Sequence, residues 1–471
     1  MSVVLGLDIG TTTITALALD VKSGLTIARH SVANKTEVIK PSVDPQGRSE
    51  WDAALILQRA VDCLREVAQE LGARVSDVSG LGITGQQHGV VLVDQNLQCV
   101  TPYINWQDRR GELSASDLEG NHDTFIDFAH GLIGTNAQQR NGCQLATGYM
   151  GCTLAWLHHY GRLPSGNNTA AFIMDYVAAT FAASQIVSSP SSAASSGIFD
   201  IHQQAWNLNA INALGLSSDV FPAIGKATDV LGTLSEKWAT TMHLPEGIPV
   251  FVPSGDNQAS FVGTVTESRT QLLINVGTGG QVAMYSEIAA YHPDLEIRPF
   301  PLGGYLLVNA GLCGGRSFAE LERFFAATIG EFTGSVPSES LFNQMCELAG
   351  EVPAGSNGLR CSPLFTGTRS RPELRASWEH IGLDNFTAGH LIRALLEGMA
   401  RVFSDGYAMM KEVTGCEMTH IVCAGNGLRE NALLRECIEL ELQLPLQVAA
   451  AQEEASIGAA MIAAAGLESK A

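Results

Sequence analysis

Short apolar runs that end in glycine and threonine recur along the chain and predict its strands. Residues 3–7 form such a run, which leads into Asp8-Ile9-Gly10-Thr11-Thr12, and two further runs cover 14–19 and 25–32. Apolar runs closed by polar turns are typical of buried strands. The chain is therefore predicted to open with an antiparallel meander. Apolar positions at helical spacing then predict a helix over 51–71.

A similar pattern returns in the second half of the chain. Residues 271–276 are apolar in their centre and lead into Asn275-Val276-Gly277-Thr278, and a second strand is predicted over 281–285. Further short strands are predicted over 80–84, 250–252 and 420–424. A repeated meander followed by strand and helix units favours two similar α/β domains, although two short turns can also match by chance. We expect a boundary at 264/265, and we expect the serine-rich stretch 188–197 to be a surface loop or lid.

Composition narrows the class of protein. The 471 residues are 45% hydrophobic and 16% charged, which is typical of a compact chain with two or three domains. The net charge of −20 argues against binding to nucleic acid or to an anionic membrane, but backbone N–H groups and a metal ion can still hold a phosphate. No two of the ten cysteines form a C-x-x-C pair, and neither a signal peptide nor a spanning segment is visible. We therefore expect a reduced, cytoplasmic protein.

The turn at residues 8–12 is the first candidate for chemistry. Asp8 can hold Mg²⁺, and the hydroxyls of Thr11 and Thr12 can bond phosphate oxygens. A single turn of this kind is more often a capped β-turn, but two copies favour phosphate binding between paired turns. Neither a Walker A loop nor a kinase glycine loop is present there.

Other polar residues follow predicted strands and suit a sugar. Asp256 follows the strand at 250–252 and could accept a hydroxyl proton, with Asn257 beside it; the alternative is a turn aspartate bonded to its own backbone. The segment Trp106-Gln107-Asp108 combines an aromatic ring with polar groups, as polyol sites do. Gln87 and His88 form a second polar set, although a lone histidine is more often structural.

These motifs, taken in order, resemble the FGGY-type carbohydrate kinases. The resemblance covers nearly the whole chain, and it also includes Thr147–Thr153, Asp175-Tyr176-Val177 and residues 452–460. The motifs that carry it are 8–12, 85–89, 106–108, 255–257, 275–279, 425–427 and the long segment 365–398.

The resemblance implies two ribonuclease-H-like α/β domains of the actin and sugar-kinase type, with ATP, Mg²⁺ and a sugar in the cleft between them. Residues 1–264 would be the sugar-binding domain and 265–471 the nucleotide-binding domain. Asp256 would be the catalytic base, and Asp8 would stand near Mg²⁺ and the phosphates with Thr11 and Thr12. The other implied contacts are Gly277 and Thr278 on phosphate, Gly315, Gly425 and Asn431 beside the adenosine, and Gln87, His88, Asp108 and Asn257 facing the sugar.

The substrate implied is a small ketose, with sedoheptulose first and xylulose or another pentulose as the alternative. Many family members have Lys where this chain has Thr15 and Met where it has Gln87, and the second departure adds a polar group beside the sugar. A sugar sensor that binds without transfer is an alternative of another class, and a homodimer is possible. Chaperone ATPases and filament proteins share the architecture, but the sugar-facing cluster argues against those roles.

Overall fold

The computed structural model describes residues 3–115, 122–368, 371, 373–450 and 452–469, and these form two compact units. The first unit contains residues 1–263, 297–306 and 453–471, and the second contains 264–296 and 307–452. No helix in the described ranges has the length and apolar character needed to cross a membrane.

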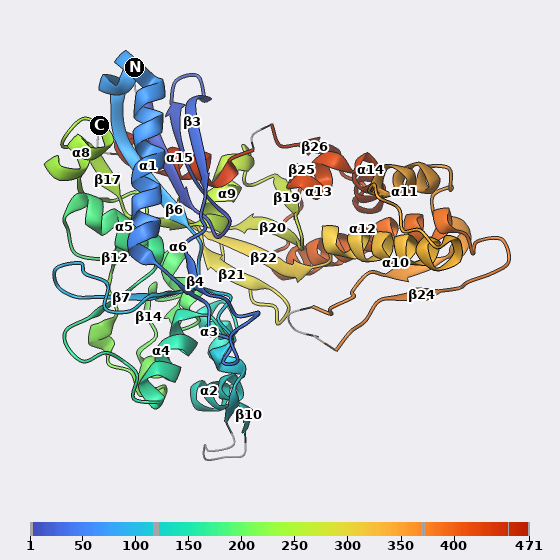
Figure 1. The fold of residues 1–471 in the computed structure, drawn as a ribbon, viewed down its shortest axis with the longest axis horizontal. Helices are drawn as coiled ribbons and strands as arrows, with labels where there is room; N and C mark the ends of the chain where they lie inside the picture. Colours follow the sequence, from blue (N-terminus) through green and yellow to red (C-terminus); the bar gives the residue numbers. More distant parts are fainter. Residues whose placement is uncertain (1–2, 116–121, 369–370, 372, 451, 470–471) are drawn as a thin grey trace. The chain divides into compact units, whose positions relative to one another are not determined.

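The first unit is built on a seven-stranded sheet (Figure 1). Its opening strands β1, β2 and β3 pair antiparallel, so the predicted meander is confirmed. β6 then pairs parallel to β1 on the other side, and β17 and β18 both pair parallel to β6. The strands are β1 (Val3–Ile9), β2 (Thr13–Asp20), β3 (Leu25–Ala33), β6 (Val78–Gly85), β16 (Val230–Thr233), β17 (Pro249–Phe251) and β18 (Ser254–Gly255).

Helices cover both faces of this sheet. The helix predicted over 51–71 is α1 (Ala53–Leu71); its apolar side packs with Leu5 and Leu7 in the larger core. Alternate residues of β1 point the other way, where Val4 packs with Ala460 and Ala463 of α15 (Glu454–Glu468). A strand with apolar residues on both faces is therefore buried on both faces, as in other sheets with helices on each side.

Smaller elements complete the first unit around the sheet. Short strands pair as β5 (Glu50–Trp51) with both β4 (Glu37–Ile39) and β8 (Tyr103–Ile104), β7 (Val91–Val93) with β11 (Thr169–Ala171), β9 (Ser114–Ala115) with β10 (His122–Thr124), β12 (Val187–Ser188) with β15 (Ala223–Ile224), and β13 (Phe199–Asp200) with β14 (Ala205–Trp206). The remaining α-helices are α2 (Phe125–Ile133), α3 (Ala137–Asn141), α4 (Met150–His159), α5 (Ile173–Ala182), α6 (Pro190–Ala193), α7 (Leu208–Ala213), α8 (Glu236–Met242) and α9 (Asp256–Thr264).

The prediction of a surface loop or lid over 188–197 is wrong. The segment contains the short helix α6 and a 3₁₀ turn, and nearly all of it is buried. Several of its hydroxyls bond to one another and to the local backbone: Ser189 Oγ lies 2.9 Å from Ser191 Oγ, and Ser195 Oγ donates to the carbonyl of Ser192 at 2.7 Å. Serines that are hydrogen-bonded within their own turn can be buried at little cost.

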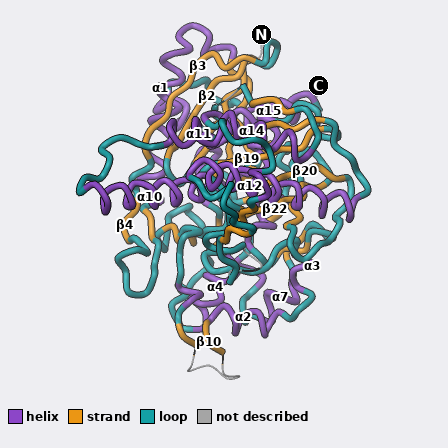
Figure 2. The backbone as a smooth tube through the Cα atoms, turned by 90° about the vertical axis from the view of Figure 1, so that its right-hand side faces the viewer, coloured by secondary structure: helices purple, strands orange, loops and turns teal. Residues whose placement is uncertain are grey.

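The second unit repeats the arrangement of the first around a six-stranded sheet. β19 pairs antiparallel with β20 and parallel with β25, just as β1 pairs with β2 and β6. Figure 2 shows β19 and β20 beside the long helix α12. Residues 297–306, which include most of β21 (Glu296–Pro299) and the first two residues of β22 (Tyr305–Leu312), belong to the first unit although both strands are in this sheet. The other elements are β19 (Gln271–Val276), β20 (Gly280–Ser286), β23 (Arg360–Ser362), β24 (Ser377–Glu379), β25 (His420–Ala424), β26 (Leu446–Val448), α10 (Gly315–Thr333), α11 (Phe342–Gly350), α12 (Ala388–Thr414), α13 (Asn426–Glu430) and α14 (Ala432–Leu442).

Candidate active site

The turn between β1 and β2 holds the first group of predicted residues. Thr11 Oγ1 donates to Gln86 Oε1 at 3.2 Å and accepts from the indole Nε1 of Trp106 at 3.0 Å. The side chain of Asn34 donates to the carbonyl of Gly10 at 2.8 Å. Thr12 is exposed at the tip of the turn. These bonds tie the turn to residues from three other parts of the first unit.

Asp8 lies at the end of β1, opposite Thr84 of β6, in an environment that disfavours its negative charge. Burial, together with smaller effects of the carboxylates of Asp256 and Glu453, raises the pKa of Asp8 to about 8. The Oδ1 atom of Asp8 is enclosed without a hydrogen-bond partner. A buried oxygen of this kind beside two other carboxylates fits a divalent cation, and Mg²⁺ sites often use one or two carboxylates together with phosphate oxygens. The described residues contain no cluster of three or more metal-binding side chains.

Asp256 is the first residue of α9, so it lies at a helix start rather than on the loop expected from the sequence. Its Oδ1 accepts a hydrogen bond from the backbone N–H of Asn257 at 2.7 Å, and both residues are partly buried. Burial raises the pKa of Asp256 to about 6, against the opposing effect of Arg298 and of backbone hydrogen bonds. The carboxylate therefore titrates close to neutral pH, where a general base works best.

Gln87 packs directly against the residue before Asp256. Its amide lies so close to Gly255 that a Cβ on that glycine would be 2.1 Å from Gln87 Nε2. Gln87 is 3% exposed; its Nε2 donates to the carbonyl of Ser191 at 2.9 Å, and its Oε1 accepts from Nη1 of Arg298 at 3.2 Å. Gln258 donates to the same carbonyl at 3.2 Å. The serine-rich segment thus helps to hold the start of α9.

His88 has a backbone φ of +76°, which is unusual for a residue with a side chain. Its ring stacks on Tyr149 with centroids 4.0 Å apart, and its Nδ1 lies 2.8 Å from the carbonyl of Ser195. Because a carbonyl only accepts, Nδ1 must carry the proton and Nε2 is the acceptor in the neutral ring. Left-handed backbone at such a residue is often found at functional sites.

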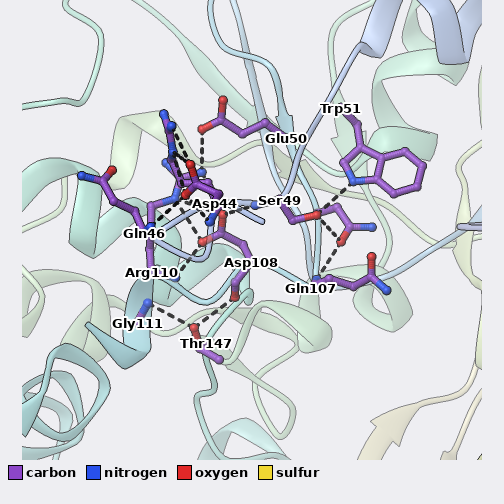
Figure 3. A network of polar contacts seen from close by, with 12 residues as sticks. Asp44, Gln46, Ser49, Glu50, Trp51, Gln107, Asp108, Arg110, Gly111 and Thr147 are labelled. Atoms are coloured by element: carbon purple, nitrogen blue, oxygen red, sulfur yellow. Dashed lines mark hydrogen bonds and ion pairs between the residues drawn. The ribbon is translucent and has the colours of Figure 1, made fainter. Parts of the chain in front are cut away.

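Asp108 lies in a buried network of polar contacts (Figure 3). It is 1% exposed, and its carboxylate accepts from the backbone N–H of Ser49 at 2.8 Å and forms an ion pair with Arg110 at 2.9 Å. Arg110 also pairs with Glu50 at 3.0 Å. Both oxygens of Asp108 are therefore engaged with the protein, and this carboxylate holds the backbone N–H groups of Ser49 and Arg110.

The second unit carries the matching turn between β19 and β20. The backbone of this turn contacts the start of α10: Gly315 N–H donates to the carbonyl of Gly277 at 2.9 Å, and Arg316 N–H donates to that of Thr278 at 3.0 Å. Gly277 and Thr278 are exposed, and a Cβ on Gly277 would meet nothing within 4 Å. Gly425 lies against the end of β19 with a φ of +83°, and a Cβ there would be 2.4 Å from the carbonyl of Val276.

A cavity of about 100 Å³ lies within the second unit beside this turn. It brings together Gly315 and Asn431 of the predicted residues, whereas Gly425 is not in its lining. Asn431 also caps α14 by accepting from Leu434 N–H at 2.9 Å. The walls are mostly apolar; they comprise Val276, Gly315, Phe318, Ala319, Glu322, Phe342, Leu396, Met399, Gly427, Asn431 and Leu434. The mostly apolar lining suits an uncharged group.

Two charged residues near Asp8 and Asp256 were missed by the sequence reasoning. Arg298 is 8% exposed on β21, where a cation stands within the apolar run Ile297–Phe300. Glu453 immediately precedes α15 and pairs with Arg29 at 3.1 Å. A charge inside an apolar strand was a usable signal for Arg298, because buried arginines need partners. No local pattern around Glu453 indicates that it would approach Asp8.

Comparison with known proteins identifies the family. Residues 3–263 match the model of the N-terminal domain of the FGGY family of carbohydrate kinases, and residues 274–467 match that of its C-terminal domain. The chain is 26% identical to human sedoheptulokinase over 98% of this chain and 97% of the relative. It is 24% identical to the xylulose kinase of Bacillus subtilis (strain 168) over 99% of this chain and 88% of the relative.

Solved structures agree on the fold. The crystal structure of gluconate kinase from Lactobacillus acidophilus matches with a TM-score of 0.84 at 17% identity, over 99% of this chain and 89% of that one. The expectation of two α/β domains of the sugar-kinase type is confirmed. Sugar kinases of this family use ATP, so the phosphoryl donor and a small-molecule sugar acceptor follow from membership. The chain belongs to the FGGY family of carbohydrate kinases.

Proposed function

We propose that this carbohydrate kinase transfers a phosphoryl group from ATP to a ketose, with sedoheptulose as the first-choice substrate and sedoheptulose 7-phosphate as the product. The observation that supports it most is the Asp256 carboxylate, partly buried at the start of a helix with a pKa of about 6, beside the polar side chains of Gln87 and Arg298. The ranking of sedoheptulose rests on the similarity to sedoheptulokinases. Xylulose or another pentulose is the second candidate, because xylulose kinases are nearly as similar.

In this proposal Asp256 accepts the proton of the attacking hydroxyl. Burial keeps its carboxylate basic near neutral pH, and the hydrogen bond from Asn257 N–H fixes one of its oxygens. Gln87, His88, Asp108 and Asn257 orient the sugar, with Asp108 already engaged by Arg110 and so contributing mainly to the shape of the site. Phosphoryl transfer depends mostly on such positioning and on stabilising charge.

The remaining proposed roles concern the nucleotide. Thr11 and Thr12 in the first unit, and Gly277 and Thr278 in the second, would contact phosphate oxygens. Asp8 would hold Mg²⁺, which supplies charge neutralisation on the phosphates when it is bound. Gly315, Gly425 and Asn431 would border the adenosine, with the apolar cavity beside Gly315 and Asn431 taking the base. The cytoplasmic location and the homodimer stay predictions.

The test is ADP release from ATP and Mg²⁺ across a panel of ketoses, with mass spectrometry and ³¹P NMR of the product to identify the phosphorylated hydroxyl. We expect one ketose to stimulate release strongly and Asp256→Asn to lower kcat by about 100-fold or more. Asp219→Asn is the matched control, because Asp219 is an exposed aspartate of the same unit. Near-normal turnover in Asp256→Asn would contradict the base assignment. A sugar that binds without any ADP release would instead favour the sensor.

A further inference from the structure

A cavity of about 320 Å³ lies within the first unit, and the proposed catalytic and binding roles do not use it. Three short segments and Gln204 form its walls: 189–191 of the serine-rich stretch, 226–228, and 299–303 around the turn between β21 and β22. Among the described residues, none of those proposed to contact the sugar or the nucleotide lines it. Ligand sites in proteins usually measure about 300–1,000 Å³, so this cavity has room for a small metabolite.

The lining combines apolar surface with a single charge. Pro190, Phe300 and Leu302 supply carbon surface. Lys226 is the one charged residue among the described residues of the lining. The carboxylate of Asp229 accepts from the backbone N–H of Lys226 at 2.9 Å, but among the described residues no carboxylate pairs with the Lys226 ammonium. In a chain with a net charge of −20, a cavity whose lining carries only a positive charge favours an anion.

Two neutral side chains in the lining are available for hydrogen bonds. The amide of Gln204 and the hydroxyl of Thr228 have no partner in the described part of the chain. An amide and a hydroxyl can each both donate and accept, so they suit the oxygens of a polar ligand. The hydroxyls of Ser189 and Ser191, by contrast, already bond to each other at 2.9 Å.

We propose that this cavity binds a small organic anion. The phosphate or carboxylate of the ligand pairs with the Lys226 ammonium, and its carbon skeleton lies against Phe300 and Leu302. Gln204 and Thr228 bond its remaining oxygens. An uncharged sugar lacks the partner for Lys226, and inorganic phosphate lacks the carbon skeleton, so each should bind more weakly than a ligand with both. The site goes beyond the proposed function, because it does not depend on phosphoryl transfer.

Calorimetric titration of the full chain without ATP tests the site with a matched set of hexoses. Glucose 6-phosphate carries a phosphate, glucuronate carries a carboxylate, and glucose carries neither; inorganic phosphate is the fourth probe. We expect at least one of the two anionic hexoses to bind about tenfold or more tightly than glucose and inorganic phosphate, since a bond to a charged group contributes about 1.5–3 kcal/mol. The tighter of the two identifies phosphate or carboxylate as the preferred group.

Variants connect that binding to the cavity. Lys226→Gln should weaken binding of the anionic hexose about tenfold or more and leave glucose unchanged. Lys22→Gln is the matched control, because Lys22 is an exposed lysine of the same unit outside the cavity, and it should keep the wild-type affinity. Leu302 is 48% exposed, so its replacement should not disturb folding. Leu302→Glu adds a like charge beside the anion and should weaken binding more than its neutral counterpart Leu302→Gln.

Two results would overturn the inference. One is the failure of both anionic hexoses to bind the wild type at about 10 mM. The other is an unchanged affinity in both Lys226→Gln and Leu302→Glu, which would place the bound anion elsewhere. Because these titrations contain no ATP and measure no turnover, they give the same answer whether or not the chain phosphorylates a ketose.

Discussion

The contact between β6 and the C-terminal helix α15 allows a sharp test of the fold. The backbone of β6 approaches α15 so closely that a Cβ on Gly82 would lie 2.0 Å from the carbonyl oxygen of Ala459 and 2.6 Å from its carbonyl carbon. Ordinary contact begins at 3.4 Å, so in Gly82→Ala the helix backbone must withdraw by about 1.4 Å, the difference between the two distances. Gly6 of β1 makes an equally close contact with Ser456, so the helix cannot tilt away from one strand alone.

The expected cost follows from that geometry. Overpacking against a well-packed core costs about 1–3 kcal/mol, and the upper end applies because backbone atoms, not a flexible side chain, are in the way. The unfolded Ala variant has less conformational entropy than the unfolded wild type, which offsets about 0.4–1 kcal/mol of this loss of stability. A net loss of about 2–2.6 kcal/mol corresponds to a fall of roughly 5 °C or more in the melting temperature of the first unit.

Differential scanning calorimetry of Gly82→Ala measures this change. Gly131→Ala is the matched control: it lies within α2 of the same unit, and its nearest neighbour, at 3.3 Å, is a side-chain atom of His122. A helix interior favours alanine, so the control should melt at the wild-type temperature or slightly above. A melting temperature of Gly82→Ala within 1 °C of the wild type, measured to roughly that precision, would refute the close packing of α15 on β6.

Three more predictions concern buried charge and the nucleotide turn. Asp175 is fully buried and its pKa is raised to about 8, so from about pH 4 to 8 the native state holds a proton that the unfolded chain has lost. The free energy of unfolding should therefore fall as the pH rises through that window. Urea unfolding at pH 5 and pH 8 should show a smaller change in stability for Asp175→Asn than for the wild type. Because the pKa of Asp256 is about 6, kcat/KM for the sugar should fall about tenfold per pH unit below that value, and a pH profile that is flat down to pH 5 would contradict its role as base. Gly425→Ala should raise the KM for ATP about tenfold, because a side chain at its positive φ adds roughly 1–3 kcal/mol of strain, while the KM for the sugar stays within about twofold. Steady-state kinetics with each substrate varied in turn measures both values. An equal rise in the two KM values would contradict the prediction.

The strands around the turns were predictable because their signals are local. Apolar runs closed by Gly and Thr mark where β1 and β19 end, and the observed registers place Asp8 and Asn275 at the same position, one residue before the strand end. The packing of α15 was not predictable. Gly82 and Ala459 are far apart in sequence, and α15 is rich in alanine on most of its surface, so no periodic face indicates what it covers.

The serine-rich segment was misjudged for a related reason. Its composition is that of solvent-exposed loops, and composition carries no information about hydrogen bonds that close within one turn. Once Ser189, Ser191 and Ser195 bond to one another and to the local backbone, their burial costs little. The Ser191 carbonyl is then available to Gln87 and Gln258, so a segment predicted to be a lid instead supports the start of α9.

The surroundings of Asp8 show how an acidic chain could bind a phosphate ligand. The groups that act on the pKa of Asp8 among the described residues are two carboxylates, Asp256 and Glu453, and include no cation. Arg298 lowers the pKa of Asp256 and does not act on Asp8, and Arg29 pairs with Glu453 on the surface. In the proposed function a nucleotide bound to Mg²⁺ would bring positive charge to Asp8, because the metal neutralises the carboxylate and the phosphates together. A net charge of −20 thus favours a metal-bound polyphosphate as ligand over a bare one.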